Sequence, residues 1–251
     1  MKAIEINRGQ RHILYDAELI ENPDRLGFHP DDWAAQSAII GFAEGRGTTF
    51  FVQYEGRDYV LRHYRRGGMI TRFSADRYVW TGLHRTRAWR EWQLLAKLYA
   101  QGLPVPRPVA AQVVRYGPTY SADIMTQRIT GTVTLAEHLA RQPLDPQMWA
   151  GLGRLIRQFH QHGVFHADLN AHNILLDPQD QMYLIDFDRG RIRKPSSPWQ
   201  QANLARLRRS LDKLQARVPE FHFCEPDWQT LRSAYARPDS NTGNTDSSLS
   251  R

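Results

Sequence analysis

The side chains best suited to chemistry lie in the segment HADLNAHN, residues 166–173, and in an Asp-Phe pair that begins at Asp186. The first segment has the pattern H-x-D-x-x-x-x-N. Phosphoryl transfer needs a carboxylate near the attacking hydroxyl, which Asp168 can supply. It also needs Mg²⁺ held by oxygen ligands between the β- and γ-phosphates, and Asn173 and Asp186 carry such oxygens. The pattern predicts phosphoryl transfer from ATP with Mg²⁺, with His166 expected to brace the loop.

The elements around these residues must bring the oxygen ligands together. Apolar runs bounded by turn residues predict short strands at 164–165, 173–176 and 182–185, with a tight turn at 177–180. Two strands joined by a tight turn would make Asn173 and Asp186 face one another.

Strand signals dominate the N-terminal half of the chain and helical signals the C-terminal half. Strands are expected as a hairpin within 1–20 and at 38–42, 49–54, 59–64, 109–115 and 119–127, and helices at 83–101, 134–140, 146–163, 199–217 and 226–236. The change near 126–131 predicts an α+β, bilobal fold. Its parts would be a strand-rich, nucleotide-binding N-lobe (1–126), a helical, catalytic C-lobe (127–237) and a disordered tail (238–251).

This arrangement of motifs resembles the protein-kinase-like superfamily. The resemblance implies that Gly41, Gly45 and Gly47 form a glycine-rich loop over ATP. It also implies that Arg62, on the third strand, grips the phosphates and that Glu91, on the next helix, pairs with it. Taken alone, such glycines more commonly belong to a plain hairpin turn, and a glutamate at the position of Glu91 is usually a solvated helix residue.

The departures from the superfamily pattern narrow the substrate class. Arg62 stands where the superfamily has lysine, and Asn170 where serine/threonine protein kinases commonly have lysine. Asp188 replaces the glycine of the D-F-G motif, and no A-P-E motif follows. These features favour a small-molecule or glycolipid kinase over a protein kinase. Arg62 also leaves a catalytically dead ATP-binding scaffold as an alternative, although such a scaffold would not need both metal ligands.

A closer resemblance is to the Kdo/heptose kinase family of lipopolysaccharide core synthesis, where Kdo is 3-deoxy-D-manno-octulosonic acid. It rests on the segments LRHYRRGG (61–68), DRYVWTG (76–82), RTRAWRE (85–91), GLPVPRP (102–108), HAD (166–168) and DFDRG (186–190). The resemblance implies ATP-dependent phosphorylation of the 4-hydroxyl of Kdo on a Kdo–lipid IVA acceptor. It also implies a Gram-negative source and a place at the cytoplasmic side of the inner membrane. A heptose or aminoglycoside kinase is the alternative within the enzyme class.

Residues 62–97 form a basic-aromatic segment. It has nine basic residues against Asp76 and Glu91, interleaved with Tyr64, Phe73, Tyr78, Trp80, Trp89 and Trp92. Basic and aromatic residues together suit an anionic membrane surface, so a peripheral enzyme at the inner membrane is expected. The alternative is a helix whose aromatic residues pack inward. A second basic stretch, 206–209, is interpreted as part of an ordinary amphipathic helix with Leu204, Leu207, Leu211 and Leu214 on its core face.

The overall composition sets limits on the remaining functions. The 33 basic residues outnumber the 26 acidic ones and give a net charge of +7, and only four of the 33 are lysine. Arginine favours phosphate and carboxylate partners. No recognised nucleic-acid-binding motif is present, so no nucleic-acid partner is expected. The lone Cys224 excludes a disulfide framework, and the lack of a signal peptide or long apolar run predicts a soluble, cytoplasmic protein.

Overall fold

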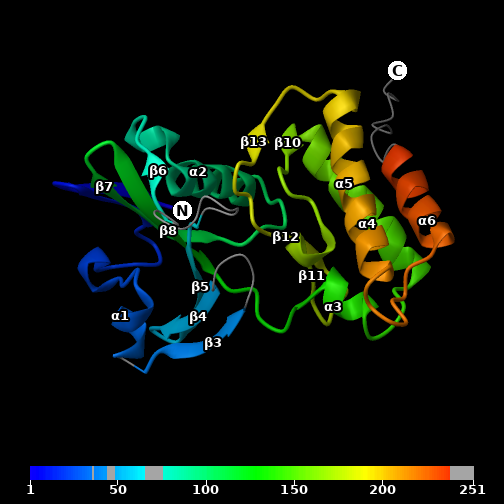
Figure 1. Cartoon of the computed structure of the whole chain (residues 1–251), viewed down its shortest axis with the longest axis horizontal. Coiled ribbons are helices and arrows are strands. Elements are labelled where there is room, and N and C mark those ends of the chain that lie inside the picture. Colours follow the sequence, from blue (N-terminus) through cyan, green and yellow to red (C-terminus); the bar gives the residue numbers. More distant parts are fainter. Residues whose placement is uncertain (36, 44–48, 66–75, 238–251) are drawn as a thin grey trace, which may run out of the picture.

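The computed structural model describes residues 1–35, 37–43, 49–65 and 76–237. Its main feature is an antiparallel eight-stranded sheet with the order β1-β2-β7-β8-β5-β4-β3, in which β6 also pairs with β8 (Figure 1). The strands are β1 (Ala3–Arg8), β2 (Arg11–Asp16), β3 (Ile39–Ala43), β4 (Thr49–Tyr54), β5 (Arg57–His63), β6 (Tyr78–Val79), β7 (Pro108–Tyr116) and β8 (Thr119–Gln127).

Side-chain alternation divides the sheet residues between two hydrophobic cores. On β8, Ile124 belongs to the larger core and Met125 to a smaller one on the opposite face. Arg62 on β5 lies directly opposite Ile124 in the antiparallel register. Because directly paired residues share a face of a sheet, Arg62 points toward the side on which the helices pack.

Helix α2 (Arg87–Ala100) packs on that face of the sheet, after the short 3-10 helix η3 (Leu83–Arg85). Its buried face includes Trp89, Trp92 and Leu95. The same face carries Glu91, which is 3% exposed. The packing of α2 therefore buries the Glu91 carboxylate on the side of the sheet to which Arg62 points.

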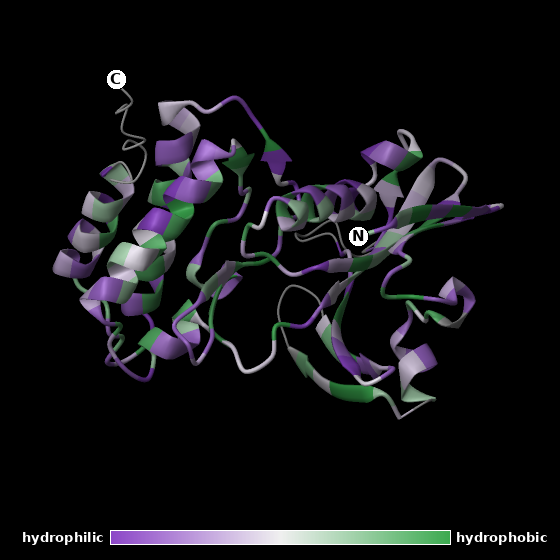
Figure 2. Ribbon diagram, turned by 180° about the vertical axis from the view of Figure 1, so that it is seen from behind, coloured by the Kyte–Doolittle hydropathy of each residue, from purple (hydrophilic) through white to green (hydrophobic). Residues whose placement is uncertain are grey.

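The C-terminal half consists of helices and two small sheets. Its helices are α3 (Leu135–Leu139), α4 (Pro146–Gln161), α5 (Ser197–Gln215) and α6 (Glu225–Ala236), and its strands are β9 (Val133–Thr134), β10 (Val164–Phe165), β11 (Ile174–Leu176), β12 (Met182–Leu184) and β13 (Arg191–Ile192). Hydrophilic and hydrophobic residues alternate around α4–α6 (Figure 2), as expected for amphipathic helices. A Cβ at Gly153 of α4 would lie 2.2 Å from the Leu231 carbonyl oxygen of α6, so glycine allows these helices to touch.

The larger core runs without a break from the sheet into the helices. It joins Leu14 and Ile124 of the sheet, Trp92 of α2 and Phe159 and Leu231 of α4 and α6. Sheet and helices therefore share buried apolar surface, which resists their separation. None of the helices in the described ranges combines the length and apolar character needed to cross a bilayer.

The α+β class is confirmed by the antiparallel sheets and the separate helices. The sequence also predicted the β1–β2 hairpin, the strands β3–β5, β7, β8 and β10–β12, and the helices α2–α6, with ends that differ by a few residues. It missed α1 (Pro30–Ala34), the 3-10 helices η1 (Pro23–Arg25) and η4 (Ala171–Asn173), and strands β6, β9 and β13, all too short to show a periodic pattern. The tail at 238–251 lies outside the described residues.

Candidate active site

The loop between β10 and β11 carries Asp168, and His166 fixes this loop from within. The His166 ring is buried, and its Nδ1 accepts a hydrogen bond from the Asp168 backbone N–H at 3.2 Å. Because Nδ1 is an acceptor, Nε2 must carry the proton that is donated to the Ile185 carbonyl at 2.9 Å. Burial lowers the pKa of His166, which favours this neutral form. The ring therefore ties the Asp168 loop to the residue that precedes Asp186.

Two amide side chains hold the backbone of Asp168 from the other side. The Asn173 Nδ2 and the Asn170 Nδ2 donate to the Asp168 carbonyl oxygen at 2.9 and 3.1 Å. Because Asn173 uses its side-chain nitrogen for this hydrogen bond, its side-chain oxygen Oδ1 takes no part in the bond and could bind a metal ion. The Ile185 N–H donates to the Asn173 carbonyl at 3.0 Å, so β11 and β12 bring Asn173 next to the chain leading to Asp186.

Asp186 has a strained backbone and a cationic neighbour. Its φ is +60°, which a residue with a Cβ adopts at a cost of about 1–3 kcal/mol. One oxygen, Oδ1, contacts Nη1 of Arg62. Burial raises the pKa of Asp186, but the Arg62 guanidinium outweighs burial and the net pKa is lowered. The carboxylate is therefore ionised near neutral pH, as a metal ligand must be.

Arg62 links the sheet, α2 and Asp186. Its Nη2 lies 2.5 and 2.6 Å from the two carboxylate oxygens of Glu91, while its Nη1 contacts Asp186. Burial opposes the charge of Arg62, but Glu91 and Asp186 raise its pKa well above the ordinary value. Burial raises the pKa of Glu91 against the opposing effect of Arg62, and the Tyr64 hydroxyl also donates to this carboxylate. The predicted contact between Arg62 and Glu91 is therefore present.

A second ion pair fastens α2 to the same loop. Arg87, at the first position of α2, donates from Nε to Asp188 Oδ1 at 2.8 Å, and its Nη2 contacts Asp188 Oδ2. The Arg87 side chain also donates to the Tyr78 hydroxyl at 2.6 Å. A cation is unfavourable at a helix N-terminus, so a basic residue in this position was a signal that a carboxylate lies nearby. The sequence showed Asp188 only as a departure from the usual glycine.

Helix α5 contacts the Asp168 loop directly, which the sequence did not predict. Its Asn203 accepts from the His166 N–H at 3.2 Å and donates to the His166 carbonyl at 3.0 Å. Its Ser210 accepts from the Ala171 N–H, and its Arg206 lies 3.2 Å from Asp168 Oδ1. Leu204, Leu207 and Leu211 are buried as expected. A polar residue within that apolar stripe, Asn203, was the available signal.

Of the three glycines expected to form the loop over ATP, only Gly41 lies among the residues that the structure describes. Gly41 lies in β3, where a Cβ would come within 3.2 Å of the Phe51 ring on β4, so close packing favours glycine there. Gly45 and Gly47 lie outside the described residues. The structure thus brings Arg62, Glu91 and Asp186 into one cluster and holds Asp168 and Asn173 on one loop, which His166 fastens to Ile185.

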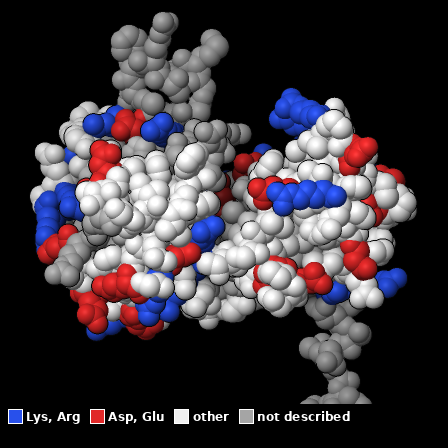
Figure 3. Space-filling model, turned by 90° about the horizontal axis from the view of Figure 1, so that it is seen from below, with Lys and Arg blue, Asp and Glu red and all other residues white. Residues whose placement is uncertain are grey.

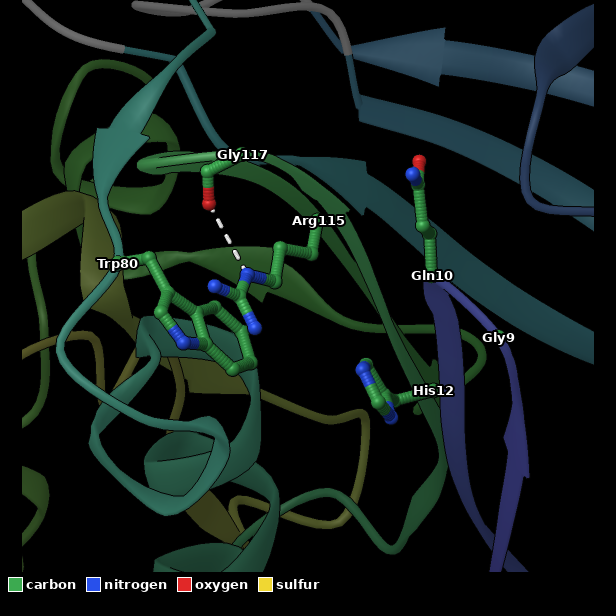
Figure 4. A pocket seen from close by; sticks show the side chains of 6 residues that line it. All are labelled: Gly9, Gln10, His12, Trp80, Arg115 and Gly117. Carbon is green, nitrogen blue, oxygen red and sulfur yellow. Dashed lines mark hydrogen bonds between the residues drawn. The ribbon is translucent and has the colours of Figure 1, made fainter.

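A separate cavity of about 300 Å³ lies at one end of the large sheet (Figure 4). Trp80, Arg115 and His12 line it, together with Gly9, Gln10 and Gly117. The Arg115 guanidinium stands over the Trp80 ring, 5.0 Å from its centroid, and donates to the Gly117 carbonyl at 3.0 Å. None of the candidate catalytic or metal-binding residues lines this cavity.

The basic-aromatic segment is only partly exposed, which corrects the sequence interpretation. Trp89, Trp92, Tyr64 and Tyr78 are buried and pack in the larger core. They therefore cannot face a membrane. The Arg62 and Arg87 guanidinium groups are used in ion pairs within the protein, Arg62 with Glu91 and Arg87 with Asp188. Phe73 lies outside the described residues.

Known proteins similar to this chain share most of its length. A 3-deoxy-D-manno-octulosonic acid kinase of Xylella fastidiosa is 44% identical over 223 residues, covering 89% of this chain and 88% of the relative. A protein of the same name from Photobacterium profundum is 40% identical over 229 residues, covering 91% and 96%. The family model for the lipopolysaccharide kinase (Kdo/WaaP) family matches residues 31–235. With this coverage, the chain belongs to the lipopolysaccharide kinase (Kdo/WaaP) family.

Proposed function

We propose that this protein is an ATP-dependent kinase that phosphorylates the 4-hydroxyl of Kdo on Kdo–lipid IVA. Relatives that cover most of the chain are named 3-deoxy-D-manno-octulosonic acid kinase, which supports Kdo as the acceptor sugar. The observation that carries the kinase assignment is the cluster in which Arg62 bridges Glu91 and Asp186. It joins a cation for phosphate groups to a carboxylate for a metal ion, next to the loop that bears Asp168.

The proposed architecture is bilobal, with ATP between a nucleotide-binding N-lobe (1–126) and a catalytic C-lobe (127–237). Residues 127–129 connect the two and would lie beside the adenine. Gly45 and Gly47 would form the loop over the phosphates, and Gly41 belongs to strand β3, which precedes them in the chain. The larger core is common to both parts, so movement between the lobes would be restricted by shared packing.

Asp168 is proposed as the base that receives the proton of the acceptor hydroxyl. As that oxygen bonds to the γ-phosphorus, the bond from phosphorus to the bridging oxygen breaks and ADP leaves. The hydrogen bonds from Asn170 and Asn173 fix the Asp168 backbone. The Asp168 side chain is 44% exposed, so an acceptor can reach it.

Asn173 and Asp186 are proposed to hold Mg²⁺, because each offers an oxygen that is not used in the contacts described above. When bound, Mg²⁺ neutralises charge on the phosphates. Arg62 would grip the α- and β-phosphates with donors that remain beyond its contacts with Glu91 and Asp186, since a guanidinium carries five N–H groups. Glu91 holds the orientation of Arg62.

The test of this proposal is phosphate transfer from ATP to Kdo–lipid IVA, with free Kdo, a heptose acceptor and an aminoglycoside as comparison substrates. Wild-type protein should label Kdo–lipid IVA, and Asp168→Asn, which keeps the shape of the side chain, should be slower by about 10²–10⁴-fold. Transfer only to a heptose or an aminoglycoside would reassign the acceptor. ATP binding without transfer to any acceptor would instead indicate an inactive scaffold.

A peripheral position at the inner membrane is proposed to depend on one edge of the large sheet. We define the β6 edge as Arg77, Val79, Trp80, Arg115 and Tyr116. Val79 and Tyr116 are 65% and 43% exposed, although both are apolar or aromatic. The Arg77 guanidinium lies 3.4 Å from the centre of the Tyr116 ring. This combination of exposed apolar groups and cations suits an anionic lipid surface.

In the part of the chain that the structure describes, Arg115 of the β6 edge has no carboxylate partner, while Arg77 is paired weakly with Asp76 at 3.6 Å. Their charge is therefore available to lipid phosphates. By contrast, basic and acidic side chains are interspersed on the face shown in Figure 3. A face of mixed charge attracts an anionic surface less than a group of unpaired cations does, which favours the β6 edge.

A further inference from the structure

Helix α5 presents one row of polar side chains to the loop that carries Asp168. Asn203, Arg206 and Ser210 are three and four positions apart, a spacing that places them on the same side of a helix. Asn203 makes two hydrogen bonds to the backbone of His166, and Ser210 accepts one from Ala171. These contacts stand on either side of Arg206, so the backbone position of Arg206 relative to Asp168 is fixed.

The contact between Arg206 and Asp168 leaves both groups open to a ligand. Nη1 of Arg206 lies 3.2 Å from Asp168 Oδ1, and the two side chains are 48% and 44% exposed. The loop itself, residues 166–173, contains no lysine or arginine. The positive charge beside Asp168 therefore comes from α5, and most of the guanidinium donors of Arg206 face no protein acceptor among the described residues.

The two cations near the candidate active site serve different carboxylates. Arg62 reaches Asp186 from the sheet, on the side proposed for the phosphates of ATP. Arg206 reaches Asp168 from α5, on the residue proposed to receive the acceptor hydroxyl. A cation beside the base is therefore placed to meet the acceptor. A neutral sugar would gain little from it, whereas an acidic sugar would gain a charged hydrogen bond.

We propose that Arg206 binds the carboxylate of the acceptor sugar and so selects an acidic sugar over a neutral one. This inference rests on the proposed function, which makes Kdo the acceptor. In Kdo the carboxylate is attached to the ring carbon two positions from the carbon that bears the 4-hydroxyl. With that hydroxyl at Asp168, the carboxylate lies within reach of a flexible guanidinium beside the same residue. Arginine suits this role because its planar fork matches a carboxylate in two parallel hydrogen bonds.

The test compares two acceptors, Kdo–lipid IVA and the same molecule with the Kdo carboxylate converted to a neutral carboxamide. Arg206→Gln should raise KM for the acid by about tenfold to a hundredfold, the range expected for loss of a charged hydrogen bond. The fall in kcat/KM for the carboxamide should be much smaller, because there only the contact of Arg206 with Asp168 is lost. Arg206→Lys, which keeps the charge without the fork, should fall between wild type and Arg206→Gln.

Arg209→Gln is the matched control, because it removes the same charge from an exposed position of α5 that contacts no described carboxylate. It should behave as wild type with both acceptors. An equal fall in kcat for both acceptors in Arg206→Gln, with KM for the acid unchanged, would assign Arg206 to the phosphate or to the loop and overturn the proposal. If wild-type protein phosphorylated neither acceptor, the proposed function itself would fail, and the assignment with it.

Discussion

Arg62 occupies a position where one side chain must satisfy two carboxylates. Glu91 is almost completely buried, and Asp186 lies at the edge of the proposed metal site. A planar guanidinium reaches both through separate nitrogens, which a single ammonium group does less well. The replacement of the usual lysine is therefore consistent with an active enzyme in which the cation also holds the two acidic elements together.

At this position, Arg62→Ala should lower kcat/KM for ATP by at least about tenfold, because charged hydrogen bonds of about 1.5–3 kcal/mol each are lost. It should also reduce stability by about 3–5 kcal/mol, since Glu91 is left buried without its partner. Arg62→Lys should keep part of both. Steady-state kinetics and urea unfolding measure the two effects.

Arg65→Ala is the control for this experiment, because Arg65 is exposed just beyond the same strand. If Arg62→Ala kept wild-type ATP kinetics while Arg65→Ala lost them, the phosphate-binding role would move to Arg65.

Only some contacts of single side chains could be predicted from the sequence. The resemblance to the protein-kinase-like superfamily implied that Arg62 and Glu91 would meet. It did not predict that Arg87 meets Asp188, or that Arg206 meets Asp168. These contacts join residues 101 and 38 positions apart, and they depend on how helices pack against loops. Local patterns can indicate that a side chain such as Arg87 needs a partner, but they do not indicate which loop packs against its helix.

At the scale of elements, α2 is held to the Asp186 loop by two ion pairs, Arg62–Glu91 through the sheet and Arg87–Asp188 directly. Asp188→Asn removes the charge from the second pair but keeps the shape of the side chain. We expect a lower kcat with little change in KM for ATP, because the orientation of Asp186 relative to the phosphates is loosened. Faster hydrogen exchange at the start of α2 should accompany it.

Asp180→Asn provides the comparison, since Asp180 is an exposed acidic residue in the turn between β11 and β12. Unchanged kcat and exchange in Asp188→Asn would mean that the ion pair does not position the loop.

Three helices of the C-terminal half meet at His160 on α4. Its Nδ1 accepts from the Tyr235 hydroxyl of α6 at 2.8 Å, and its Nε2 lies 3.4 Å from Oδ1 of Asn203 on α5. Burial lowers the pKa of His160 to about 4, against the weaker opposing effect of Asn203. The unfolded chain, with an ordinary pKa of about 6.5, therefore binds the proton more readily than the folded protein.

The consequence is a loss of stability as the pH falls from about 6.5 to about 4, amounting to about 3 kcal/mol. The lowered pKa of His166 acts in the same direction, whereas the pKa of His63, raised by its hydrogen bond to Asp123, acts in the opposite one. His160→Gln should therefore flatten the dependence of the unfolding free energy on pH between about 7 and about 4.5. His162→Gln, at an exposed neighbouring position, should leave the wild-type slope, and an unaltered slope in His160→Gln would contradict the assignment.

In the molecule as a whole, the larger core and the exposed β6 edge have different roles. The core fixes the large sheet, α2 and the C-terminal helices as one packed unit. Composition indicated an anionic partner but could not locate the surface, because exposure is a property of the fold. Four of the aromatic residues that suggested a membrane surface are buried, whereas Val79 and Tyr116 of the β6 edge, one just after Tyr78 and the other outside the segment, are exposed.

The β6 edge should hold the protein on anionic lipid through its cations and exposed apolar groups. Vesicles that contain anionic phospholipid should sediment the protein at about 0.1 M salt, and neutral vesicles should do so much less. Raising the salt to about 1 M should release it, because the Debye length falls from about 10 Å to about 3 Å. The double variant Arg77→Glu/Arg115→Glu should bind weakly at low salt and keep its affinity for ATP. Arg232→Glu, an exposed charge reversal on α6, should bind as wild type does. Equal binding of the double variant and wild type would exclude the β6 edge as the lipid-binding surface. A protein that stays in the supernatant with every vesicle would exclude docking by electrostatic attraction, and the edge would then be available only to the acceptor.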